Sequence, residues 1–133
     1  MRGSRWSVVL ALAAALAGCE SAPVKGIQQE VKGVFEHHEG DPKLKAAIQD
    51  YENAHYGPAE KEFRESLELG LDKGRQVTAH KYLAFIYCVT GRKEQCRDEF
   101  RQVLAVDPSF ELDPAEAGHP IWGPVFREVK KST

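Results

Sequence analysis

The sequence predicts an all-α domain of two helical hairpins and a C-terminal capping helix, preceded by an export signal and a flexible tether. Three observations lead to this fold class. From Pro42 onward, apolar residues recur at spacings of three and four, which is the period of an amphipathic helix. Glycines and Asp-Pro pairs interrupt these patterns where hairpin turns are needed. A short apolar run behind a positively charged start opens the chain, as in export signals.

Residues 1–18 have the organisation of a signal peptide. Arg2 and Arg5 supply the positive start, and an almost uninterrupted apolar run from Trp6 to Leu16 follows. This run is shorter than the roughly 20 residues that a helix needs to cross a bilayer. No later stretch is apolar enough to add a membrane segment, so we expect an exported chain with a single N-terminal signal.

Cys19 directly follows the small residues Ala17 and Gly18, and Leu16 precedes these. This segment resembles the lipobox of bacterial lipoproteins. The resemblance implies a diacylglycerol on the Cys19 sulfur, cleavage before Cys19 and acylation of the new amine. Several acyl chains anchor a protein firmly without spanning the membrane. The alternative is an ordinary signal peptide with a chance cysteine. Glu20 leaves the choice of membrane open, and we favour the periplasmic side of the outer membrane over the inner one.

The 115 residues that follow the signal suffice for one small domain. The full chain has a net charge of −2, and the signal holds two of the 18 basic residues and none of the 20 acids, which leaves −4. A mildly acidic domain without a basic stripe argues against nucleic acid as a partner. Residues 19–41 are expected to form the lipidated tether, with a short helix over residues 27–35.

The clearest hairpin is predicted over residues 76–109. In its first helix, His80, Leu83, Ala84 and Tyr87 share one face, and Gly91 then ends the helix. The second helix carries its own apolar face and stops at an Asp-Pro pair. That second face consists of Cys96, Phe100 and Val103, and the stop is Asp107-Pro108.

This hairpin resembles a tetratricopeptide repeat at nearly every diagnostic position, with His80 in place of the usual tryptophan. The small residues Ala84 and Cys96 would let its two helices approach closely. An unrelated helical hairpin is the alternative. A weaker copy is predicted over residues 42–74, with Gly70 and Gly74 marking its end, and the two repeats are expected to share one core. The apolar positions of the weaker copy are Leu44, Ala47, Ile48, Tyr51, Tyr56, Ala59, Phe63, Ser66 and Leu67.

The C-terminal segment, residues 110–133, is expected to cap the stack. Asp113-Pro114 is a typical helix start, and residues 118–120 then turn the chain. Trp122, Phe126 and Val129 recur at spacings of four and three, which predicts a final helix over residues 121–131. We expect its aromatic side chains to pack on the second repeat. The competing interpretation makes Trp122 an exposed anchor for a partner.

No catalytic set is recognisable: the sequence lacks a phosphate loop, an HExxH motif and a nucleophile elbow. His37 and His38 are adjacent within a charged segment, where an exposed linker is favoured over a metal site. His80 lies on a core-facing stripe and is interpreted as structural. We therefore expect no enzyme, no metal, no small-molecule substrate and no cofactor apart from the lipid on Cys19.

Binding is then the expected role. The repeat resemblance implies a concave groove lined by outward residues of the first helices. Lys81 matches the lysine of the Lys/Asn clamp that some repeats use for a C-terminal carboxylate, but Tyr82 and Phe85 stand where asparagines are needed. An apolar peptide or helix is therefore the expected guest. The groove residues predicted in the stronger repeat are Thr78, Lys81, Phe85, Cys88 and Val89.

Cys88 and Cys96 remain once the lipid has taken Cys19. A hairpin turned at Gly91 brings the two positions close, and export places both thiols where disulfides form. The sequence thus predicts a Cys88–Cys96 disulfide. Two alternatives stay open: Cys96 would also suit a buried position as a free thiol, and Cys88 could face the groove.

The full pattern is similar to the small tetratricopeptide lipoproteins associated with type VI secretion, called TssQ-like. The similarity covers roughly residues 42–128 and includes the tail EAGHPIWGPVF. It implies an accessory lipoprotein that helps to assemble or anchor the envelope complex, with other envelope or secretion-system subunits as partners. A general envelope assembly factor, such as a pilotin or a regulator of cell-wall enzymes, is the second hypothesis. A periplasmic enzyme or metal carrier is the third.

Overall fold

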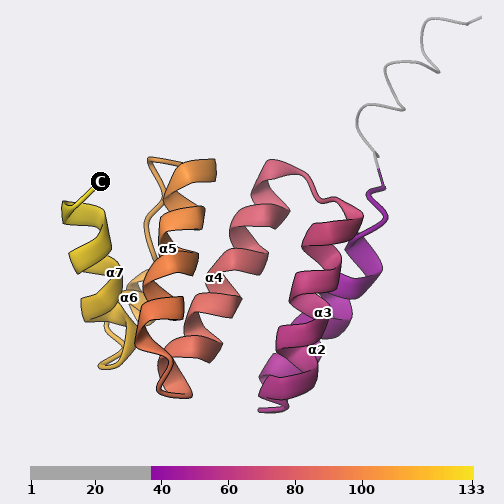
Figure 1. Ribbon diagram of the computed structural model, residues 1–133, viewed down its shortest axis with the longest axis horizontal. Helices are drawn as coiled ribbons and strands as arrows, with labels where there is room; N and C mark the ends of the chain where they lie inside the picture. Colours follow the sequence, from indigo (N-terminus) through magenta and orange to yellow (C-terminus); the bar gives the residue numbers. More distant parts are fainter. Residues whose placement is uncertain (1–36) are drawn as a thin grey trace, which may run out of the picture. The chain divides into compact units, whose positions relative to one another are not determined.

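A computed structural model of the chain describes residues 37–133, which belong to one structural unit, Glu36–Thr133. Over these residues the chain is all-helical and has no strand, as predicted, and it contains six helices (Figure 1). The predicted signal peptide, Cys19 and the helix expected over residues 27–35 lie outside the described range. No helix in that range is long and apolar enough to cross a membrane. The helices are α2 (Asp41–Glu52), α3 (Tyr56–Leu69), α4 (Lys73–Val89), α5 (Lys93–Val106), α6 (Pro114–Ala117) and α7 (Trp122–Lys131).

Helices α2 and α3 pack against each other as the first hairpin. Its predicted apolar faces meet at the core, where Leu44 and Ala47 of α2 and Ala59 and Phe63 of α3 are buried. Helix α3 ends at Gly70, whose φ of 103° favours a residue without a Cβ. The first helical hairpin thus lies where the sequence predicted one, over residues 42–74.

Helices α4 and α5 form the second hairpin and pack closely along their length. The Asp72 side chain caps α4 by accepting a hydrogen bond of 2.8 Å from the backbone amide of Arg75. Helix α4 therefore begins at Lys73, and Gly74 lies in its first turn instead of in the break where the sequence placed it. Gly91, with a φ of 80°, makes the turn into α5 as predicted.

The core contains the residues expected there: Leu83, Ala84 and Tyr87 of α4 are buried, as is Phe100 of α5. Helix α3 packs on α4, and α2 also touches α4, so the second hairpin stacks on the first. Ala84 has no exposed surface, which shows how closely the helices approach at this position. Neither hairpin could bury these apolar faces alone.

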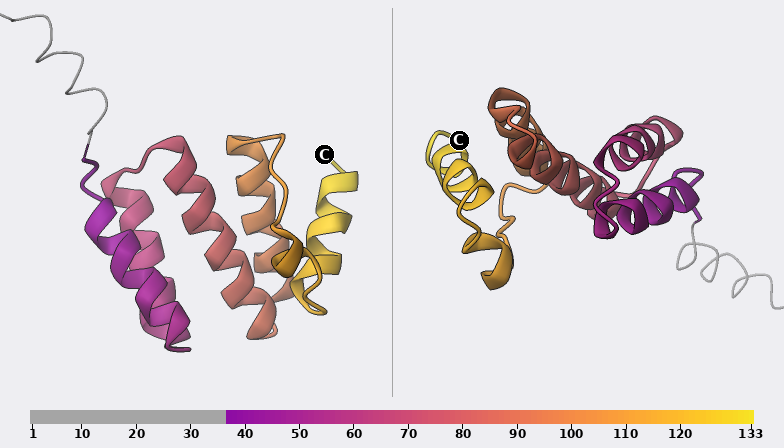
Figure 2. Two further views of the ribbon diagram at one scale, coloured as in Figure 1. Left: turned by 180° about the vertical axis from the view of Figure 1, so that it is seen from behind. Right: turned by 90° about the horizontal axis from the view of Figure 1, so that it is seen from below.

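The C-terminal segment covers the open side of the second hairpin. After α5, an extended stretch beside α7 brings the chain back to the end of the domain where α5 begins. Helix α7 therefore runs in the same direction as α5 (Figure 2). Trp122, Phe126 and Val129 are buried, and the ring of Phe126 meets that of Phe100 of α5 with centroids 5.2 Å apart. The predicted capping helix is present, and it starts at Trp122.

Candidate partner-binding surface

The residues predicted to line a groove on α4 differ widely in accessibility. Thr78 and Val89 are half-buried, and Val89 packs against the core. Phe85 is only 2% exposed, so the expectation that it lines an accessible groove is wrong. Helical spacing placed Phe85 correctly on the side of α4 opposite Leu83, but that side is covered as well.

Phe85 is covered by Trp122. The two rings stack with centroids 4.2 Å apart and planes 18° from parallel. The Trp122 indole Nε1 donates a hydrogen bond of 2.9 Å to the backbone carbonyl of Glu116, so its polar atom is satisfied. Trp122 is 9% exposed, which excludes the alternative that it is an exposed partner anchor.

Lys81 lies beside this stack and is bonded within the chain. Its Nζ is 2.6 Å from Oε1 of Glu116, and the two side chains are only 15% and 22% exposed. The same ammonium lies 5.0 Å from the centre of the Tyr82 ring. Glu116 also accepts a hydrogen bond of 3.2 Å from the backbone amide of Asp113. The Lys81 charge is therefore already compensated by a carboxylate of the C-terminal segment.

The accessible part of this surface is a group of three tyrosines, Tyr51, Tyr56 and Tyr82, which we call the tyrosine face. All three are half-buried. The ring of Tyr51 is 4.8 Å from that of Tyr82 and 5.7 Å from that of Tyr56. The Tyr82 ring stacks in turn on the buried ring of Phe63, at 5.4 Å. Packing on the core thus fixes the orientation of the tyrosine face.

The Tyr51 hydroxyl at the centre of the tyrosine face stays protonated at neutral pH. Burial, together with the neighbouring Tyr56, Tyr82 and Glu116, raises the pKa of Tyr51 to about 12. Tyrosines give a large contact area and a hydroxyl donor at low cost in side-chain entropy, and they are enriched where proteins meet. Chemically, this surface suits an apolar helix or peptide that also offers hydrogen-bond acceptors.

The predicted disulfide is present. Cys88 of α4 and Cys96 of α5 are bonded across the turn, with Cα atoms 5.2 Å apart. Cys96 has no exposed surface and Cys88 is 7% exposed, so Cys88 does not face an open groove. Both thiol alternatives considered from the sequence are therefore excluded in this structure. Cys19, the predicted lipidation site, lies outside the described residues.

An ionic network on the side of Tyr87 was not foreseen from the sequence. Glu60 of α3 is 2.6 Å from Nη2 of Arg64 and, through its other oxygen, 2.7 Å from Nη2 of Arg92. The Tyr87 hydroxyl donates to Glu60 over 3.2 Å and accepts from Nε of Arg64 over 3.1 Å. The i,i+4 spacing of Glu60 and Arg64 was the one available signal. This network ties α3 to α4 and to the turn before α5.

The network changes the titration of its members. Burial by itself would raise the pKa of the Glu60 carboxyl, but the hydrogen bond and charge of Arg92, together with Arg64, lower it overall. Burial also raises the pKa of Tyr87, against the hydrogen bond from Arg64. All four side chains serve to join helices, and we assign them no chemical role.

The histidines are dispersed. The Nδ1 of His80 lies 2.6 Å from a carboxylate oxygen of Glu99, which links α4 to α5 and fits the structural role expected for it. His37 is exposed and His38 is half-buried. Among residues 37–133, no three histidine, cysteine or acidic side chains gather in a way that could hold a metal ion.

Comparison of the chain with protein-family models, with curated proteins and with solved structures finds no match.

Proposed function

We propose that this chain is a membrane-tethered periplasmic lipoprotein that binds another envelope protein and thereby assists the assembly of a type VI secretion envelope complex. The proposal assigns it no catalytic activity and no cofactor other than the lipid on Cys19. The observation that carries it is the tyrosine face, a half-exposed aromatic surface held rigidly by the core of two stacked helical hairpins.

Three further features support the proposal. The two stacked hairpins with a capping helix are the arrangement that a tetratricopeptide domain would adopt. The Cys88–Cys96 disulfide suits an exported, oxidising location. The sequence before Cys19 resembles a lipobox. A general envelope assembly factor, such as a pilotin or a regulator of cell-wall enzymes, has the same structural requirements and remains the second candidate.

Lipid anchoring is tested with Cys19→Ser in the native host. We expect the wild-type chain in the membrane fraction as a mature-sized band, and the variant as an uncleaved or soluble protein. A variant that still fractionates with membranes at mature size would contradict the lipoprotein proposal.

Partner binding is tested by cross-linking in intact cells, purification of the full chain from detergent extract and mass spectrometry. We expect a type VI envelope subunit among the cross-linked proteins, and its loss with Tyr82→Arg. Tyr82→Phe keeps the ring and should retain capture, while Leu69→Ser removes an exposed apolar side chain elsewhere and serves as the matched control. A secretin or a cell-wall enzyme in place of the type VI subunit would favour the second candidate.

Circular dichroism of each variant separates a binding defect from unfolding. Equal capture by Tyr82→Arg and wild type, with both proteins folded, would contradict the assignment of the tyrosine face.

A further inference from the structure

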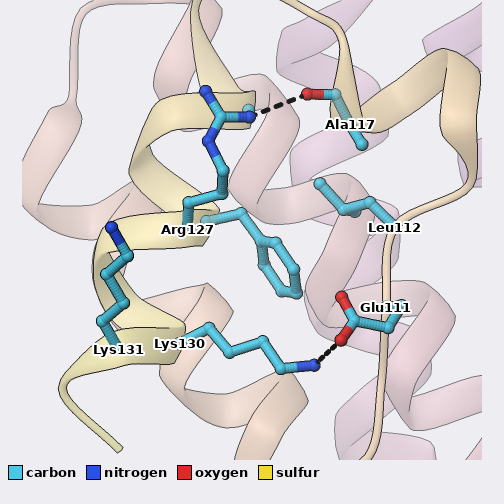
Figure 3. Close-up of a pocket in the computed structure, with 8 residues that line it drawn as sticks. Glu111, Leu112, Ala117, Arg127, Lys130 and Lys131 are labelled. Carbon is cyan, nitrogen blue, oxygen red and sulfur yellow. Dashed lines mark hydrogen bonds and ion pairs between the residues drawn. The ribbon is translucent and has the colours of Figure 1, made fainter.

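A second surface lies on the other side of the C-terminal segment, where the extended stretch before α6 runs beside α7. The two enclose a cavity of about 330 Å³ whose walls are apolar (Figure 3). Leu112 contributes from the extended stretch, Ala117 from α6, and Gly123 and Phe126 from α7. A Cβ on Gly123 would collide with the carbonyl of Ala117, so only glycine permits this close approach of α6 and α7.

The mouth of this cavity is basic. Arg127, Lys130 and Lys131 of α7 surround it, and Glu111 is the one acidic residue in its lining. Lys130 is engaged within the chain, because its Nζ pairs with Glu111 and donates to the carbonyl of Phe110 over 2.8 Å. The remaining cations, Arg127 and Lys131, are exposed. The cavity therefore joins an apolar interior to a positively charged edge.

The two exposed cations retain free hydrogen-bonding capacity. Within residues 37–133, the Arg127 side chain makes one hydrogen bond, from Nη1 to the Ala117 carbonyl over 3.1 Å, and the Lys131 side chain makes none. The bond to Ala117 holds the guanidinium at the cavity mouth (Figure 3), and its other N–H groups make no hydrogen bond within the described residues. A guanidinium presented in this way suits a carboxylate, which it can bind through two parallel hydrogen bonds.

We propose that this cavity binds an acidic segment of a partner protein. One large apolar side chain of that segment enters the cavity, and carboxylates beside it pair with Arg127 and Lys131. The volume is at the lower end of the range for ligand sites and suits one or two side chains. The charge of the mouth is complementary to an acidic segment and repels a basic one.

An anionic membrane surface is less well matched. Membrane recognition by basic residues generally uses clusters of about four to eight lysines and arginines, whereas this mouth has two exposed cations. Its apolar groups are also recessed behind the charges, because Leu112 and Phe126 are 7% and 3% exposed and cannot insert between lipids. A recessed apolar pocket with a charged rim is the arrangement found at protein interfaces.

The test uses the full chain in nanodiscs of neutral phosphatidylcholine. The probe is a fluorescent peptide in which a central Leu-Phe pair is flanked on each side by two aspartates. We expect saturable binding by fluorescence anisotropy. A peptide with lysines in place of the aspartates, or with Ser-Ser in place of Leu-Phe, should bind at least tenfold more weakly. Equal binding of the acidic and basic peptides would overturn the proposal.

Charge reversal locates the site. The double variant Arg127→Glu, Lys131→Glu should weaken binding of the acidic peptide at least tenfold. Lys131→Glu alone, which disturbs no bond within the described residues, should weaken it about threefold. The matched control Lys93→Glu, Arg101→Glu makes the same change of charge on α5 and should alter the affinity less than twofold. Equal weakening by control and test variants would overturn the proposal.

Two further measurements separate this site from the alternatives. Tyr82→Arg should leave peptide binding unchanged, since the inference does not rest on the tyrosine face, and loss of binding in a folded Tyr82→Arg variant would overturn it. Hydrogen exchange over residues 110–131 should slow when the peptide binds. The same measurement is repeated without peptide, with phosphatidylglycerol in the nanodisc. If this lipid slows the exchange and the double variant abolishes the effect, the site binds membranes and the proposal is overturned.

Discussion

Trp122 lies flat on Phe85, with ring centroids 4.2 Å apart, and this contact joins the C-terminal cap to the centre of the second hairpin. His119 stacks on the same indole, with its plane 4° from parallel. The cap therefore adds aromatic surface to the core at the position where the sequence suggested an open groove. The stability of the cap and that of the hairpin stack are consequently linked.

Trp122→Ala is expected to destabilise the whole domain by about 3 kcal/mol or more, because truncating a buried tryptophan removes its contacts and leaves a cavity. Urea unfolding followed by circular dichroism measures the change. Phe85→Glu should lose helicity, since a carboxylate would be buried beneath the indole without a partner. A folded Phe85→Glu variant would contradict the burial of Phe85.

Separation of Lys81 from Glu116 should loosen the C-terminal segment. The pair is mostly shielded from solvent, so a double-mutant cycle with Lys81→Met and Glu116→Gln should give a coupling energy of about 1–2 kcal/mol. The exposed pair Arg101–Asp98 serves as the control and should show much weaker coupling, as exposed pairs do. If both cycles give the same coupling, Lys81 does not hold the segment.

Glu60 should make stability depend on acid pH. The pKa of its carboxyl is lowered in the folded chain, so its contribution is complete above the unfolded value of 4.5 and is lost as pH falls from there through the folded pKa. Glu60→Gln should cost about 1.5 kcal/mol at neutral pH, as for hydrogen bonds to charged groups. Urea midpoints measured from pH 7 to pH 3 should converge for the two proteins. A constant difference across that range would contradict the role of Glu60.

The disulfide should be complete and stabilising. Denatured, unreduced protein should accept no maleimide at Cys88 or Cys96, and reduction should expose both. The bond closes a loop over a sequence separation of 8 residues, for which chain entropy gives about 2.6 kcal/mol. Cys88→Ala should therefore lower the free energy of unfolding by about that amount. Labelling without reductant would show that the bond does not form in solution.

Local periodicity in the sequence was sufficient for most of the helical framework. The spacing of Leu83, Ala84 and Tyr87 defined a buried face of α4, and Phe63 and Phe100 were assigned to the core on the same basis. The turn at Gly91 and the proximity of the two cysteines then followed from hairpin geometry. These features depend on residues within one or two helical turns of each other, so the sequence reveals them directly.

The tertiary structure decided what covers each face. The position of Phe85 on α4 follows from helical spacing. Its burial depends on Trp122, which reaches Phe85 only because the chain folds back after α5 through an extended stretch. The partner of Lys81 is likewise a residue of α6. The cavity beside α7 exists because that stretch makes α7 run in the same direction as α5. Helical period specifies which residues share a face, whereas long-range packing determines which of those faces solvent can reach.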